Sequence, residues 1–145
     1  MTSNMINRDV YDMPYLKSGI WLFCIALLVR ISYILFFVEP EYFLIEDQAI
    51  YVQLAQQLPN SDFLGANTER VPGYPLFMAS IYTLFGDGEW SVIIVQILLD
   101  SISCVMMALT AYSLFGKGFW IAGILSAANL NMIILSSTLL TDTLF

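Results

Sequence analysis

The chain contains no histidine, and its five basic residues face twelve acidic ones, which gives a net charge of -7 over 145 residues. The absence of histidine removes the commonest general base, the commonest zinc ligand and every Ser–His or Cys–His nucleophile pair. The acidic balance excludes an electrostatic nucleic-acid-binding protein, which needs a basic surface. Acid–base chemistry in this chain would therefore depend on carboxylates, tyrosine or lysine.

Cysteine is also scarce. Cys24 and Cys104 both lie in apolar runs, and they lack the close spacing of a redox or metal-binding pair. Because isolated cysteines in apolar runs usually serve as small buried residues, we expect both in the core.

Charged residues make up only 12% of the chain, whereas about a quarter of the residues in soluble proteins are charged. Apolar residues make up 59% and gather in long runs. A helix needs roughly 20 apolar residues to cross a bilayer. Three runs have about this length: residues 20–38, 90–114 and 119–137. The pattern predicts an all-α, multi-pass transmembrane helix bundle.

A fourth apolar run, Leu76 to Phe85, is shorter, and runs of about 10–14 residues are more often interfacial than spanning. Lysine and arginine gather on the cytoplasmic side of membrane proteins. Three spans leave Arg8, Lys17 and Lys117 all in the cytoplasm, whereas a fourth span would move Lys117 outside. We therefore expect the short run to form a surface helix.

These expectations describe one membrane domain. Its parts are a cytoplasmic tail (1–19), the three spans, an external segment (39–89) with surface helices at about 47–58 and 75–85, and an external end (138–145). Because the chain remains apolar up to Phe145, we expect 1–145 to be the N-terminal part of a longer domain.

The external segment contains an acidic pair, Glu46 and Asp47, followed by a helical pattern. Tyr51, Leu54 and Ala55 recur at helical spacing with glutamines on the other side, which predicts an amphipathic helix along the membrane surface. Asp47 and Tyr51 are four residues apart and share a face of that helix. On spacing alone, Asp47 either caps the helix or takes part in acid–base chemistry.

A second motif, Glu69-Arg70-Val71-Pro72-Gly73-Tyr74-Pro75, holds the one basic residue of the external segment. Its prolines restrict the backbone, and a guanidinium near the membrane surface suits bidentate binding of a phosphate. The alternative for Arg70 is a salt bridge to Glu69 or Asp62. Asp142, after the third run, lies on the same outer face as Asp47, and a solvated helix end would also explain it.

Arg30 and Asp100 are the ionisable residues inside the predicted spans. A lone charge at mid-membrane costs about 2.5–3.5 kcal/mol on insertion scales. From the helical rise per residue, Arg30 lies about 12 Å and Asp100 about 15 Å below the outer surface. We therefore expect the two to face each other, directly or through a polar residue such as Gln96. The alternative has Arg30 pointing toward a lipid phosphate.

In chain order, the motifs resemble the beginning of the GT-C superfamily of membrane glycosyltransferases, in the branch of the protein mannosyltransferases and lipid A aminoarabinose transferases. The family pattern D-x-x-x-Y-x-x-x-A is matched by Asp47, Tyr51 and Ala55. Further matches are R-x-P-G-Y-P at 70–75, L-F-G at 84–86 and 114–116, Q-x-x-x-D at Gln96 and Asp100, and L-T-[DE]-x-L-F at 140–145. The order and spacing carry the resemblance, which begins at about residue 20. One departure is the acidic pair, which reads Glu-Asp where many relatives read Asp-Glu.

The resemblance implies transfer of a sugar from a polyprenyl-phosphate donor to an acceptor hydroxyl at the outer membrane face, with inversion. Asp47 would be the base, with Glu46 as the other candidate, and Arg70 would stabilise the departing phosphate. Substrate-binding roles are implied for Arg70, Glu69, Tyr51, Tyr74 and Asp142. Asp142 and Glu69 leave room for a divalent cation, and no other cofactor is implied.

The sugar and the acceptor, whether protein, lipid or glycan, are left open. The family is much longer than this chain, so we expect the fragment alone to be inactive, in a bacterial or archaeal plasma membrane rather than the endoplasmic reticulum. The competing hypothesis is a transporter fragment or an accessory subunit, which Arg30 and Asp100 would also suit.

Overall fold

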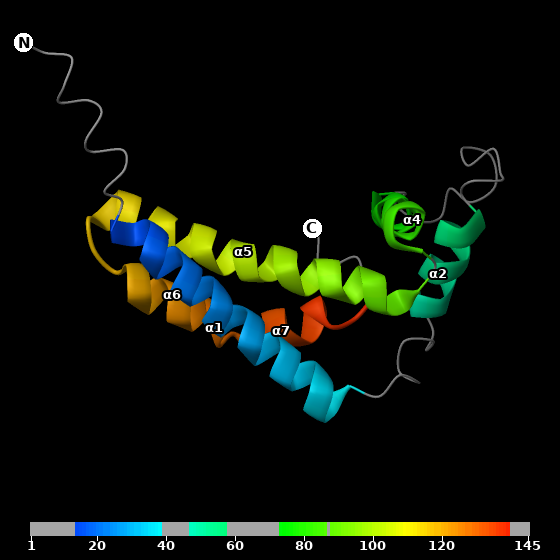
Figure 1. Ribbon diagram of the computed structural model, residues 1–145, viewed down its shortest axis with the longest axis horizontal. Helices are drawn as coiled ribbons and strands as arrows, with labels where there is room; N and C mark the ends of the chain where they lie inside the picture. The colour runs from blue at the N-terminus through cyan, green and yellow to red at the C-terminus, as the bar shows by residue number, and fades with distance from the viewer. Residues whose placement is uncertain (1–13, 39–46, 58–72, 87, 140–145) are drawn as a thin grey trace, which may run out of the picture.

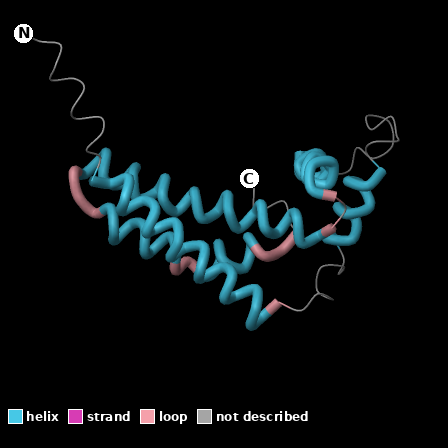
Figure 2. Tube along the Cα trace, in the orientation of Figure 1, coloured by secondary structure: helices cyan, strands magenta, loops and turns pink. Residues whose placement is uncertain are grey.

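The computed structural model describes residues 14–38, 47–57, 73–86 and 88–139. Within these ranges every regular element is a helix and there is no strand (Figure 2). The helices are α1 (Pro14–Phe37), α2 (Asp47–Gln57), α4 (Gly73–Phe85), α5 (Glu89–Phe115), α6 (Phe119–Ala127) and α7 (Leu130–Ser136). The all-α prediction agrees with this part of the chain.

The long helices α1 and α5 are apolar enough to cross a membrane, over Leu16–Phe37 and Glu89–Phe115. They run antiparallel and form, with α6, the elongated body of the molecule (Figure 1). The helix α1 begins six residues before the predicted span, at Pro14, because proline is well suited to the first turn of a helix. Gly116 ends α5 in the left-handed conformation, with φ of 65°, and its N–H donates to the carbonyl of Tyr112.

The third apolar run differs from the single span expected at 119–137. It forms two helices, α6 and α7, which are bent by 54° at a short break. The side chain of Asn129 caps α7 by accepting hydrogen bonds from the backbone N–H groups of Asn131 and Met132. An asparagine that binds the backbone in this way competes with a continuous helix. The described chain therefore has two long apolar helices, or three spans if the bent pair crosses as one.

The short helices α2 and α4 lie together beside the beginning of α5 (Figure 1). The bounds of α2 agree closely with the predicted 47–58, and α4 begins two residues before the predicted 75–85. With 13 residues, α4 is too short to cross a bilayer.

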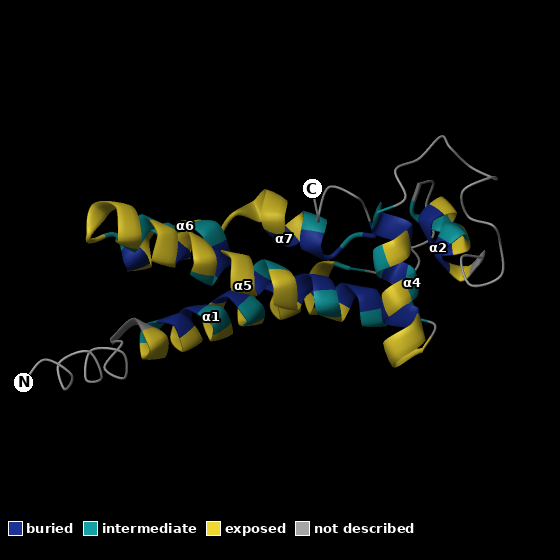
Figure 3. Ribbon diagram, turned by 90° about the horizontal axis from the view of Figure 1, so that it is seen from above, coloured by how far each residue is buried: buried dark blue, intermediate teal, exposed yellow. Residues whose placement is uncertain are grey.

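The largest core lies where α2 and α4 meet α5. It includes Tyr51 and Val52 of α2, Tyr74 and Met78 of α4, and Ile93 of α5. Along the body, by contrast, many large apolar side chains on the outer faces of the helices are exposed (Figure 3). A bilayer would cover such faces, which a soluble protein would rarely leave open.

A glycine brings α6 close to both long helices. A Cβ atom at Gly123 would overlap the methyl groups of Leu22 on α1 and lie 3.2 Å from the Cβ of Ala108 on α5. Gly123, Leu22 and Ala108 are all buried, so the close approach is part of the packed interior.

Candidate functional site

Three residues from three separate motifs meet where the short helices join α5. The rings of Tyr51 and Tyr74 are nearly perpendicular, at 85°, with centroids 5.3 Å apart. This edge-to-face arrangement is one that aromatic pairs prefer. The side-chain amide Nε2 of Gln96 donates a hydrogen bond to the hydroxyl of Tyr74, at 3.2 Å. We call Tyr51, Tyr74 and Gln96 the Tyr–Gln cluster.

Local sequence explains how α2 brings Tyr51 to this cluster. Tyr51 and Ala55 are buried, whereas Gln53 and Gln56 on the other side of α2 are exposed. This is the amphipathic pattern that the spacing predicts, and the apolar face is turned toward α4.

Burial governs the chemistry of Tyr74. Removal from water raises the pKa of its hydroxyl well above the usual value, the neighbouring Tyr82 and Tyr51 raise it further, and the hydrogen bond from Gln96 acts in the opposite direction. The phenolate is therefore disfavoured. At neutral pH Tyr74 acts as a hydrogen-bonding group and not as a base.

Gln96 is only partly satisfied in this environment. Its side chain is almost fully buried, and its Oε1 atom has no hydrogen-bond partner among the described residues. The Tyr74 hydroxyl can pair with one end of the amide at a time, whichever way the amide is turned.

A second polar cluster, within the body, is built around Arg30. The Nε of Arg30 donates to Oδ2 of Asp100 at 2.6 Å, and its Nη1 donates to the carbonyl of Ala26 at 3.0 Å. Its Nη2 lies 3.3 Å from the sulfur of Cys104, to which the hydroxyl of Ser126 also donates. The pairing that the two depths predict therefore forms directly, without Gln96 as a bridge. Arg30 does not point toward a lipid phosphate, which was the alternative.

Cysteine 104 and Ser126 were not predicted as members of this cluster. Cys104 follows Asp100 by four residues on α5, so its place on the same face could have been read from the helical period. Nothing in the sequence around Ser126 marks it. Cys24, expected in the core, is exposed on α1 instead.

The helix α5 carries both clusters. Gln96 and Asp100 are four residues apart, so they lie on one face of α5 and about 6 Å apart along its axis. The Q-x-x-x-D pattern thus places Gln96 against Tyr74 of the short helix α4 and Asp100 against Arg30 of α1.

Most of the predicted reactive residues lie outside the described residues: Glu46, Glu69, Arg70 and Asp142. Asp47 is the first residue of α2, and only its backbone is described. The described ranges contain no group of three acidic or cysteine side chains that could hold a metal ion. Glu69 and Asp142, for which the resemblance leaves a divalent cation possible, are not among those residues.

Comparison of the chain with known protein families, with curated proteins and with solved structures found no match.

Proposed function

We propose that this chain is the N-terminal part of a multi-pass membrane glycosyltransferase, similar to the GT-C superfamily, that uses a polyprenyl-phosphate-linked sugar as donor. The reaction takes place at the outer face of a plasma membrane. Its acceptor is a hydroxyl group of a protein, a lipid or another glycan.

The contact between Tyr51 and Tyr74 is the observation that carries this proposal. Asp47 precedes Tyr51 by one helical turn on α2. Arg70 precedes Tyr74 by four residues, a length of chain that spans at most about 14 Å. The contact supports the proposal because it joins the helix that begins with Asp47 to the helix that follows Arg70 in the sequence.

The proposed chemistry follows from these two side chains. The Asp47 carboxylate accepts the proton of the acceptor hydroxyl as its oxygen attacks the anomeric carbon. The bond from that carbon to the phosphate oxygen breaks, and the lipid phosphate leaves with the bonding electrons. Arg70 stabilises the negative charge that develops on the phosphate. Attack from the opposite side inverts the configuration of the sugar.

Transport is the second function considered, because Arg30 and Asp100 lie deep in the body. The Arg30 side chain is completely buried, and its contacts to Asp100, Ala26 and Cys104 occupy all three of its nitrogen atoms. A group held in this way suits helix packing better than passage of a substrate. The structure therefore gives transport no specific support.

The test uses membranes that contain the protein encoded by the whole reading frame. Labelled polyprenyl-phosphate-linked hexoses and pentoses are supplied as donors, and transfer to membrane acceptors is measured. Asp47→Asn retains the shape of the side chain but removes the base, so transfer should fall about 100-fold or more. Gln56→Asn, on the exposed face of α2, is the matched control and should transfer normally.

Two results would change the proposal. If Asp47→Asn transfers normally while Glu46→Gln does not, the base is Glu46. If the unaltered protein transfers sugar from none of these donors, the glycosyltransferase proposal is wrong.

A further inference from the structure

A buried glutamine in an apolar environment needs an explanation. Gln96 has 1% of its surface exposed, and Val92, Ile93 and Ile97 of the same helix belong to the apolar core. A buried amide loses its bonds to water, and Gln96 recovers a bond to Tyr74 while its Oε1 atom has no partner in the described ranges. An apolar side chain of the same length would avoid this cost. Packing stability alone therefore does not account for glutamine at this position.

Directional bonding does account for it. Apolar contacts between α4 and α5 tolerate sliding and rotation, because the hydrophobic effect has no direction. A hydrogen bond requires a particular distance and angle between the Gln96 amide and the Tyr74 hydroxyl. Buried polar groups can in this way select one arrangement of packed helices.

The hydrogen bond at Tyr74 also affects the position of α2. The helix α4 packs on both α2 and α5, and Tyr74 contacts Tyr51 on one side and Gln96 on the other. Tyr74 thus connects the surface helix that begins at Asp47 to a helix long enough to span the membrane.

We propose that Gln96 is a positioning residue, which holds α4 through Tyr74, and α2 through Tyr51, in one orientation on α5. The effect on helix docking stands on the structure alone. The consequence for catalysis, namely correct placement of Asp47, rests on the proposed function.

The docking effect is tested in membranes with the protein of the whole reading frame, by mass spectrometry after reaction with a water-soluble maleimide. Ala55→Cys reports opening of the α2 interface, because Ala55 is 1% exposed. Gln56→Cys, on the exposed face of α2, is the control. Combining Gln96→Met with Ala55→Cys should raise labelling at residue 55 roughly tenfold, the change expected when one hydrogen bond is lost from a closed state. Labelling of Gln56→Cys should be unaffected.

Two further measurements separate positioning from general support of the fold. The double variant Gln96→Met, Tyr74→Phe should leave thermal stability unchanged or raised, since it replaces both partners of the hydrogen bond by apolar side chains of similar volume, whereas each single change leaves the other polar group buried without its partner. Tyr74→Phe should increase labelling as Gln96→Met does, and the double variant should show no more than either change alone, because both remove the same bond. Unchanged labelling in both single variants would overturn the proposal, and so would a large loss of stability in the double variant.

The catalytic consequence is measured separately as sugar transfer. For Gln96→Met we expect a lower kcat with little change in the KM for the donor, because misplacement of the base affects the reaction more than binding. The protein could show increased labelling at residue 55 in the Gln96→Met variant and yet have no transferase activity in its unaltered form. In that case Gln96 would still be a positioning residue, and only the proposed function would be wrong. Normal kcat together with increased labelling would end the catalytic role.

Discussion

Arg30 connects three helices through one buried side chain. It belongs to α1, it contacts Asp100 and Cys104 on α5, and Cys104 in turn accepts a hydrogen bond from Ser126 on α6. A buried charge is costly unless it is paired and hydrogen-bonded, and Arg30 meets both conditions. The cluster therefore stabilises the association of α1, α5 and α6 only as long as its members remain together.

Removal of one charge should consequently cost more than removal of both. Arg30→Leu leaves Asp100, whose side chain is only 12% exposed, without its partner, and we expect a loss of about 3 kcal/mol in the free energy of unfolding, near the lower end for a buried pair because Asp100 is only partly buried. The double variant Arg30→Leu, Asp100→Leu should recover much of that loss. Thermal or denaturant unfolding of the purified protein in detergent measures both.

Lys17→Leu is the control for this experiment, since Lys17 is exposed and should contribute little. Two results would show that Arg30 and Asp100 do not act as a buried pair. One is normal stability of Arg30→Leu, and the other is a double variant that is less stable than Arg30→Leu by the full cost of Asp100→Leu alone.

The helix α6 packs closely against both long helices. It is only nine residues long, and Gly123 lets it lie directly against Leu22 of α1 and Ala108 of α5. Glycine within a helix normally costs about 1 kcal/mol relative to alanine. Here the contact that it permits outweighs this cost, because any side chain would have to displace Leu22.

Gly123→Val should therefore destabilise the protein by about 1–3 kcal/mol, although valine has the better helix propensity. Ile124→Val introduces the same residue at the neighbouring exposed position and should have a small effect. The two variants are compared by unfolding in detergent. A Gly123→Val variant as stable as the original would mean that α1 and α6 are not packed tightly at this point.

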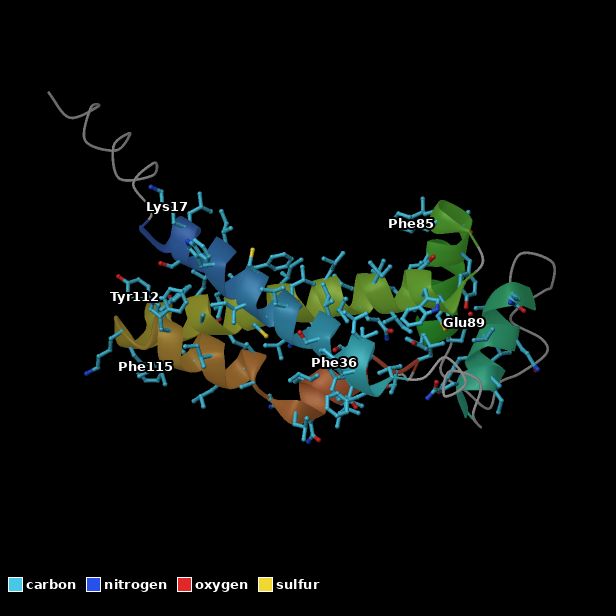
Figure 4. The ribbon with its side chains drawn as sticks, turned by 60° about the horizontal axis from the view of Figure 1, so that its bottom comes forward. Lys17, Phe36, Phe85, Glu89, Tyr112 and Phe115 are labelled. Atoms are coloured by element: carbon cyan, nitrogen blue, oxygen red, sulfur yellow. The ribbon has the colours of Figure 1, made fainter. Side chains whose placement is uncertain are left out.

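The described part of the molecule has two chemically different ends. Lys17 lies at the end of the body where α5 finishes at Phe115, and Glu89 lies at the opposite end with the short helices α2 and α4 (Figure 4). Lys117 follows directly in the turn between α5 and α6. The basic residues of the described chain other than Arg30 are therefore grouped at one end. From the positive-inside rule we therefore expect that end to lie in the cytoplasm.

This orientation predicts a labelling pattern in intact cells. An impermeant maleimide should react with Gln56→Cys on α2, whereas Lys117→Cys should react only after the membrane is permeabilised. Thr143→Cys extends the test to α6 and α7: reaction from outside is expected if the bent pair crosses the membrane. Reaction of Lys117→Cys in sealed cells would reverse the orientation, and protection of Thr143→Cys would make the bent pair re-entrant.

The sequence by itself determined the features that depend on local periodicity and on length. The two long apolar helices follow from runs that match the thickness of a bilayer, and α2 follows from the spacing of Tyr51 and Ala55. The pairing of Arg30 with Asp100 also followed, because the depth of a residue in a span can be counted along the helix.

The tertiary structure alone decided the contacts that depend on how helices are rotated and bent. Asn129 breaks the third apolar run, yet its side chain could equally have faced a neighbouring helix without interrupting the run. Cys24 and Cys104 lie in similar apolar runs, and only the packing of α1 against α5 and α6 turns one outward and buries the other. The bond between Gln96 and Tyr74 joins residues 22 positions apart on separate helices. Such a contact depends on the rotation of α4 relative to α5, which neither helix encodes alone.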